Sequence, residues 1–192
     1  MKTFKNSLAA VALFFALAAS AATVVVAAVP NADSDQGVEG QQILKRVRKE
    51  LVTLPYYGVF DNLAYKVEGD TVTLYGQVVR PSTRSDAGRR VAKIKGVGRV
   101  INNIEVLPLS GFDDSIRAEA YRAIFNTGSL YRYAMGSNPS LHIVVNRGHV
   151  TLEGVVGNRM DKQLAEFAAR AVPGVFSVTN NLVAERDDRK VR

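Results

Sequence analysis

The residues that could do chemistry in this sequence are cations and aromatic side chains, and they do not form a catalytic set. The 192-residue chain has 25 Lys and Arg against 18 Asp and Glu, a net charge of +7. Zero Cys and only two His exclude a disulfide scaffold, an iron–sulfur cluster, a thiolate zinc site and a cysteine nucleophile. The sequence has no G-x-S-x-G, P-loop or H-E-x-x-H motif. We therefore expect no catalytic residue, no metal site and no cofactor, and a polyanion as the partner.

The positive charge is concentrated in the first half of the chain. Residues 41–110 hold 12 bases and 6 acids, whereas residues 111–185 hold 7 of each. Near a membrane, anionic headgroups attract each base by about 1 kcal/mol. The alternative is a solvated helix face that keeps the protein soluble. The predicted basic surface consists of Lys45, Arg46, Arg48, Lys49, Arg89, Arg90 and Lys93.

A second candidate surface interleaves aromatic and basic side chains between residues 121 and 133. At a membrane interface, Tyr rings lie at headgroup level and Arg contacts phosphate. The alternative is that these rings pack in a core or between two domains, because small domains need large side chains to bury enough area. The predicted lipid-binding residues are Tyr121, Arg122, Phe125, Leu130, Tyr131, Arg132 and Tyr133.

The elements that must position these residues occur twice. When the sequence is aligned with itself at a spacing of 78 residues, TVTLYGQV (71–78) matches HVTLEGVV (149–156), and IKGVGRVINNIEV (94–106) matches VPGVFSVTNNLVA (172–184). Without a gap, 13 of 44 positions are identical between residues 63–106 and 141–184. Random pairing would give only a few identities, so we interpret the chain as two copies of one small domain.

Each copy has the same predicted order of elements. A first helix places Ile43, Val47 and Leu51, or their counterparts in copy two, at helical spacing. Two alternating strands joined by a tight turn follow, then a second helix that ends at a glycine, then a third strand. For the second helices, Ser82 and Asn158 are the predicted N-caps. The fold class is therefore α+β, with two tandem α-β-β-α-β domains, each a two-layer sandwich of two helices on a three-stranded mixed sheet.

Several recurring residues are interpreted as structural. Gly76, Gly96, Gly154 and Gly174 occupy matching positions in the two copies, where backbone geometry and close packing explain them. The pairs at 102–103 and 180–181 are Asn in both copies and are assigned to backbone hydrogen bonding or to a β-bulge.

The two histidines do not recur. His142 and His149 stand where copy one has Ala64 and Thr71, and a duplicated metal or catalytic site would occur in both copies. We interpret them as surface or edge histidines.

The N-terminus predicts export. Two Lys precede twelve apolar residues (8–19), and small residues follow, as in a secretory signal peptide. An uncleaved inner-membrane anchor through residues 8–29 is the alternative, since that stretch is long enough to span a bilayer. The predicted organisation is a signal peptide (1–28), a solvated linker (29–40), domain 1 (41–108), domain 2 (112–186) and a basic tail (187–192).

The repeat resembles the BON domain, a family named for bacterial osmotic-stress and nodulation proteins. The resemblance rests on the order of elements and on VTLYGQV with GVGRVINNI in copy one, and VTLEGVV with GVFSVTNNL in copy two. A signal peptide before two such domains is similar to osmotically inducible periplasmic proteins. Because the chain lacks the Cys of the dual-domain outer-membrane lipoproteins, the soluble periplasmic branch is the nearer match.

The resemblance implies a non-enzymatic periplasmic protein of the cell envelope that binds phospholipid surfaces and supports the osmotic-stress response. In the dual-domain lipoproteins, lipid contact is attributed to the first helix region of the second domain, which corresponds here to the segment from Tyr121 to Tyr133. We expect an anionic phospholipid membrane surface as partner, with envelope proteins as further partners, and, because of export, no nucleic acid. The alternative functions are a periplasmic protein–protein interaction module without lipid binding, and an enzyme with a dispersed site.

Overall fold

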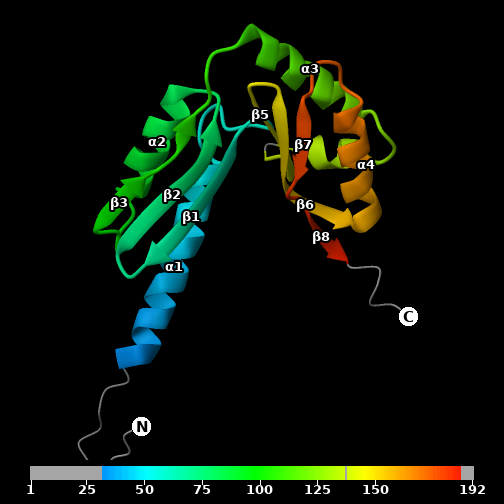
Figure 1. The fold of residues 1–192 in the computed structure, drawn as a ribbon. Helices are drawn as coiled ribbons and strands as arrows, with labels where there is room; N and C mark the ends of the chain where they lie inside the picture. The colour runs from blue at the N-terminus through cyan, green and yellow to red at the C-terminus, as the bar shows by residue number, and fades with distance from the viewer. Residues whose placement is uncertain (1–31, 137, 187–192) are drawn as a thin grey trace, which may run out of the picture. The chain divides into compact units, whose positions relative to one another are not determined.

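The computed structural model of this chain describes residues 32–136 and 138–186, with side chains from residue 40 to 185 except 137. The proposed signal peptide, the alternative anchor and the basic tail lie outside the described residues. The element order of the described part repeats once, as the sequence predicts (Figure 1).

The first repeat forms domain 1. Its elements are α1 (Ala32–Val52), β1 (Asn62–Glu68), β2 (Thr71–Val78), α2 (Pro81–Val91), β3 (Arg99–Asn102) and β4 (Glu105–Val106). β2 lies in the middle of the sheet, antiparallel to β1 and parallel to β3 and β4. The predicted third strand is therefore interrupted, and its two parts pair with the same edge of β2.

The second repeat forms domain 2 with the same topology. Its elements are α3 (Gly111–Phe125), a 3-10 helix η1 (Leu130–Ala134), β5 (Leu141–Asn146), β6 (His149–Asn158), α4 (Arg159–Arg170), β7 (Ser177–Asn180) and β8 (Val183–Arg186). β6 is the central strand, antiparallel to β5 and parallel to β7 and β8. The α+β class and the two tandem domains are confirmed.

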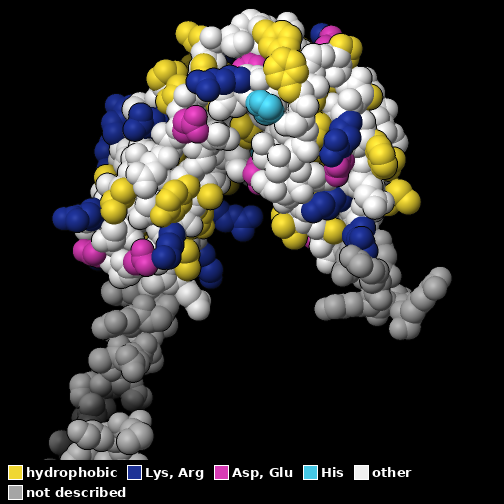
Figure 2. Space-filling view, in the orientation of Figure 1, with side chains coloured by type: hydrophobic (Ala, Val, Ile, Leu, Met, Phe, Trp, Pro, Cys, Tyr) yellow, Lys and Arg dark blue, Asp and Glu magenta, His cyan; other side chains and the backbone are white. Residues whose placement is uncertain are grey.

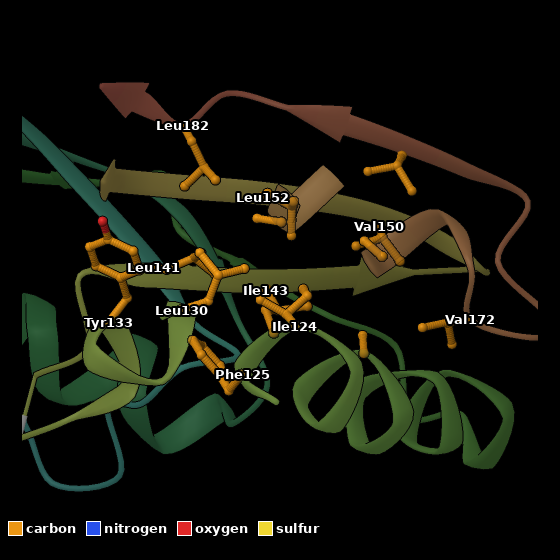
Figure 3. Packing of buried hydrophobic residues seen from close by; sticks show 14 of the residues in the cluster. Ile124, Phe125, Leu130, Tyr133, Leu141, Ile143, Val150, Leu152, Val172 and Leu182 are labelled. Carbon is orange, nitrogen blue, oxygen red and sulfur yellow. The ribbon is translucent and has the colours of Figure 1, made fainter. Parts of the chain in front are cut away.

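Each domain has its own hydrophobic core between its two helices and one face of its sheet. In domain 1, Val47, Leu51, Leu74 and Val91 are buried together. In domain 2 the core is larger because η1 contributes to it, and Figure 3 shows its labelled side chains between the helices and the strands. A strand buries alternate side chains when only one face of its sheet is covered, and β1 follows that alternation.

Two helix starts differ from the sequence-based expectation, and a third agrees with it. α1 begins at Ala32, inside the segment interpreted as a linker. α2 begins at Pro81 without a side-chain cap, because the fixed φ of proline already fits the first helical position, so Ser82 is not its cap. The cap of α4 is Asn158, as predicted, and it accepts a hydrogen bond from the amide of Asp161.

The recurring Asn and Gly residues are structural. Asn102 donates from its side-chain amide to the carbonyl of Arg84 in α2, and Asn180 donates to the carbonyl of Lys162 in α4, so each ties a third strand to a helix. Gly76 and Gly154 have φ of 115° and 112° in the second strands. A Cβ on Gly76 would lie 2.0 Å from the carbonyl oxygen of Asn62 across the β1–β2 pair. The position therefore requires glycine for two reasons, its backbone conformation and the close approach of the neighbouring strand.

We predict that Gly76→Ala lowers the free energy of unfolding by about 2–4 kcal/mol, because backbone strain adds to the clash with β1. Urea denaturation measures the change. Gly111→Ala is the matched control, since nothing lies within 4 Å of a Cβ there and its φ is not positive. An equal effect of the two substitutions would contradict this account of the strand.

Candidate binding surface

The basic surface of domain 1 results from the amphipathic character of its two helices. Ile43, Val47 and Leu51 of α1 are buried, so cations at the intervening positions are directed to solvent. In α2, Ala87 and Val91 are buried in the same way. Of the seven predicted basic residues, Arg90 is half-buried. The other six are exposed: Lys45, Arg46, Arg48, Lys49, Arg89 and Lys93. Figure 2 shows Lys and Arg side chains at the surface among apolar ones.

Two of these cations already have partners. Arg90 donates to the carbonyl of Thr53 (3.3 Å) and lies 3.6 Å from the Glu50 carboxylate, which links α2 to α1. Arg89 pairs with Asp86 on its own helix. For the other five, no ion pair with a described residue occurs. The helix layer of domain 1 therefore presents five cations without a protein anion beside them in the described part of the chain.

The aromatic segment of domain 2 is divided between core and surface. Phe125, Leu130 and Tyr133 are buried in the domain core (Figure 3), as the packing alternative requires. Tyr131 is 59% exposed, and Tyr121 is 39% exposed. The Arg122 and Arg132 side chains are also exposed, the first paired with Glu119. Of the seven predicted lipid-binding residues, only these four are at the surface to meet a headgroup.

Tyr133 and Arg132 stabilise the start of α4. The Tyr133 hydroxyl donates to the buried Asp161 carboxylate (2.5 Å) and accepts from the amide of Gly157 (2.8 Å). Arg132 forms an ion pair with the same carboxylate, and Asn158 donates to it as well. Asp161 thus already fills the positive end of this helix, and no anion site is left there.

The segment between α1 and β1 contacts domain 2. The amide of Ile143 in β5 donates to the carbonyl of Val59 (2.7 Å). His142 Nδ1 lies 3.2 Å from the carbonyl oxygen of Gly58, and its ring lies 5.5 Å from that of Tyr57. His142 is only 7% exposed, so it is not a surface histidine, although it does lie on an edge strand, β5. The sequence does contain a signal: LHIVVN (141–146) is apolar at nearly every position, which is typical of a strand covered on both faces.

Burial at this contact perturbs three ionisable groups. It lowers the pKa of His142 and raises the pKa of the Asp61 carboxyl, although Asp61 accepts from the amides of Gly58 and Val79. Burial, followed by the Asp61 charge, raises the pKa of the Tyr57 hydroxyl to about 12. All three groups are therefore held towards their neutral forms, as expected where charge is removed from water.

Sequence reasoning missed one exposed aromatic cluster. Phe112 at the start of α3 lies 5.9 Å, ring to ring, from Phe176, which precedes β7. His149, which is exposed as predicted, lies 5.9 Å from Phe176 on the other side and contacts the hydroxyl of Ser177. Phe176 is 70% exposed and stands where copy one has Gly98. That difference between the copies was the available signal.

The described residues contain no group of three or more His, Cys, Asp or Glu side chains that could hold a metal ion. Within the same residues, no helix is both long and apolar enough to cross a membrane.

Comparison with known proteins agrees with this architecture. The BON domain profile matches residues 40–108 and again residues 113–186. The chain therefore belongs to the BON-domain family, which is associated with phospholipid binding and with envelope and osmotic-stress proteins and is generally non-enzymatic.

A comparison with curated proteins gave no match. Among solved structures, the chain is similar to the C-terminal domain of CdsD, a structural protein of the type III secretion system of Chlamydia trachomatis. Identity is 10% and the TM-score 0.29, with 75% of this chain and 98% of that chain covered. A second CdsD structure gives 11% identity and the same TM-score, with 78% and 94% covered.

The pH dependence of stability tests the His142 contact. Because the pKa of His142 is lower in the folded protein, the unfolded chain binds this proton more readily. The stability from this group is complete above the ordinary pKa of 6.5 and is lost as the pH falls below it. We predict that His142→Asn, which keeps a donor for Gly58, flattens the fall in urea midpoint between about pH 7 and pH 5.

The pH profile of wild type alone does not isolate His142, because Asp61 changes the stability in the opposite direction as the pH falls. The profiles of wild type and His142→Asn are therefore compared. Its raised pKa favours the folded state as the pH falls towards its ordinary value of 3.8. The positive charge of Arg80 lowers the pKa of Asp61, whereas burial raises it. His149→Asn is the matched control, since His149 is exposed. Parallel pH profiles for wild type and His142→Asn would show that His142 is not held neutral by the contact.

Proposed function

We propose that this protein is a non-enzymatic periplasmic envelope protein that binds anionic phospholipid surfaces peripherally. The observation that carries the proposal is the helix layer of domain 1, where Lys45, Arg46, Arg48, Lys49 and Lys93 are exposed without ion pairs to described residues. Membership in the BON-domain family supports it. Export through residues 1–28 is part of the proposal.

Electrostatic attraction supplies the first part of the binding. Each base near an anionic surface contributes about 1 kcal/mol, so several together give reversible association without a bilayer-spanning segment. Over distances beyond roughly 8–10 Å such attraction is screened at physiological ionic strength. Binding should therefore weaken steeply with salt.

Shallow insertion in domain 2 supplies the second part. Tyr131 is exposed next to Arg132, and Tyr121 is exposed next to Arg122. A phenol ring at headgroup level suits the boundary between acyl chains and phosphate, and the two guanidinium groups, although paired with Asp161 and Glu119, stay exposed. Phe125, Leu130 and Tyr133 take no part in this contact, since they hold the domain core.

Neutralising two cations tests the electrostatic part. Lys45→Gln combined with Lys49→Gln should lower binding to phosphatidylglycerol-containing vesicles about thirtyfold at low salt, since two bases contribute about 2 kcal/mol. Vesicle co-sedimentation measures the loss.

The matched control removes the same charge from the other side of domain 1. Lys66 and Arg99 are exposed on strands, alternating with the residues that pack on the core. Lys66→Gln with Arg99→Gln should change binding by less than about threefold. Equal losses for the two pairs would mean that only net charge matters, and no binding of wild type at low salt would overturn the proposal.

A single substitution tests the insertion. Tyr131→Ser should weaken vesicle binding about fivefold to tenfold, because the buried part of one ring contributes on the order of 1 kcal/mol. Phe167→Ser is the control: Phe167 is 69% exposed but lies on α4. If Phe167→Ser weakens binding and Tyr131→Ser does not, the inserted surface is not the one named here. Binding to an envelope protein with no vesicle binding would favour the interaction-module alternative.

A further inference from the structure

Each domain has a groove between its first helix and the edge strand of its sheet. In domain 2 this groove is filled. Its walls are Tyr121 and Phe125 of α3, whose rings lie 4.8 Å apart, and the edge of β5. The ring of Phe60 lies 6.2 Å from that of Tyr121, and Val59 and Phe60 pack against the domain 2 core. A turn from outside the domain, closed by the hydrogen bond from the Asp61 amide to the Gly58 carbonyl (3.2 Å), thus contributes one aromatic ring and one backbone hydrogen bond.

The same groove in domain 1 is open. It has a volume of about 340 Å³, within the range of small-ligand sites, and its lining is largely apolar. Arg48 and Val52 of α1 stand in the places of Tyr121 and Phe125, since Leu51 and Ile124 are the matching core residues. The remaining lining residues are Leu51, Tyr57, Leu63 and Tyr65.

The edge of β1 has the hydrogen-bond donor that the filled groove uses. Tyr65 is opposite Leu74 in β2, in the register in which Ile143 is opposite Leu152 in β6. The amide of Ile143 points away from β6 and donates to Val59, so the amide of Tyr65 points away from β2. Among the described residues, no acceptor meets that amide. An unpaired strand edge is a template for another extended segment.

The walls of the two grooves also differ in charge, and this difference indicates the charge of the segment that binds in domain 1. Arg48 replaces the neutral Tyr121 and has no ion pair with a described residue. A carboxylate beside the aromatic side chain of the occupant would complement it.

We propose that the α1–β1 groove of domain 1 binds an extended segment of another protein, which inserts an aromatic side chain between Val52 and Leu63 and places a carboxylate at Arg48. The segment would accept from the amide of Tyr65 as the turn at residues 58–61 accepts from the amide of Ile143. The groove shares Arg48 with the basic helix layer, so peptide binding is measured without lipid.

The probe is a peptide that corresponds to residues 55–62 of this chain (PYYGVFDN), because it contains the aromatic ring that fills the domain 2 groove and an adjacent carboxylate. A dye-labelled peptide is titrated with the full chain in the absence of lipid and followed by fluorescence anisotropy. We expect weak, saturable binding below about 1 mM. Replacing the Phe or the Asp of the peptide by Ala should weaken it at least about fivefold each, which corresponds to roughly 1 kcal/mol.

Variants of the protein locate the binding. Arg48→Glu should weaken peptide binding at least about tenfold, while Lys49→Glu, the adjacent exposed base, should change it by less than about twofold. Circular dichroism confirms that both variants fold. Equal effects of the two variants, no effect of Arg48→Glu, or no binding at about 1 mM peptide overturns the proposal. So does a concentration-dependent dimer in sedimentation velocity that Arg48→Glu abolishes, since the occupant would then be a second copy of this chain.

Discussion

A three-stranded sheet in so small a domain has two faces and only two helices to cover them, and this constraint governs the rest of the structure. Both helices lie on one face, where Leu74 and Leu152 of the central strands are fully buried. Their inward sides must then be apolar, and their outward sides hold whatever charge the domain carries. The cations of α1 and α2 are at the surface for this reason. The amphipathic pattern of the helices is enough to explain their position.

The same constraint leaves strand edges and outer sheet faces unprotected, and the two domains handle this differently. In domain 2 the segment after α1 covers part of β5, where His142 is buried against Gly58 and Tyr57. In domain 1 the side chain of Tyr57 reaches the corresponding edge at Leu63, and the groove beside it stays open. The duplication therefore produced two equal folds with unequal surfaces. The basic helix layer, the exposed Tyr131 and the open groove are properties of one domain each.

Much of the fold followed from local patterns. The alternation in TVTLYGQV and HVTLEGVV predicted the central strands, and the recurrence of Gly76 and Gly154 identified positions where a side chain does not fit. Asn158 was recognised as a cap, because its hydrogen bond spans only three residues. Helix starts were less predictable: Pro81 needs no cap, and α1 begins inside the segment expected to be a linker. Those choices depend on where the chain enters the helix, which composition does not specify.

By itself the sequence determined the α-β-β-α-β order, the duplication and the uneven charge of the two copies, since periodicity and net charge are properties of short stretches of chain. Only the tertiary structure decided which members of the aromatic segment are buried. Phe125, Leu130 and Tyr133 are core residues because η1 folds onto β5, while Tyr131 on the same short helix faces solvent. The burial of His142 likewise depends on a carbonyl 84 residues earlier in the chain. Such contacts join segments that are distant in sequence, so no local pattern specifies them.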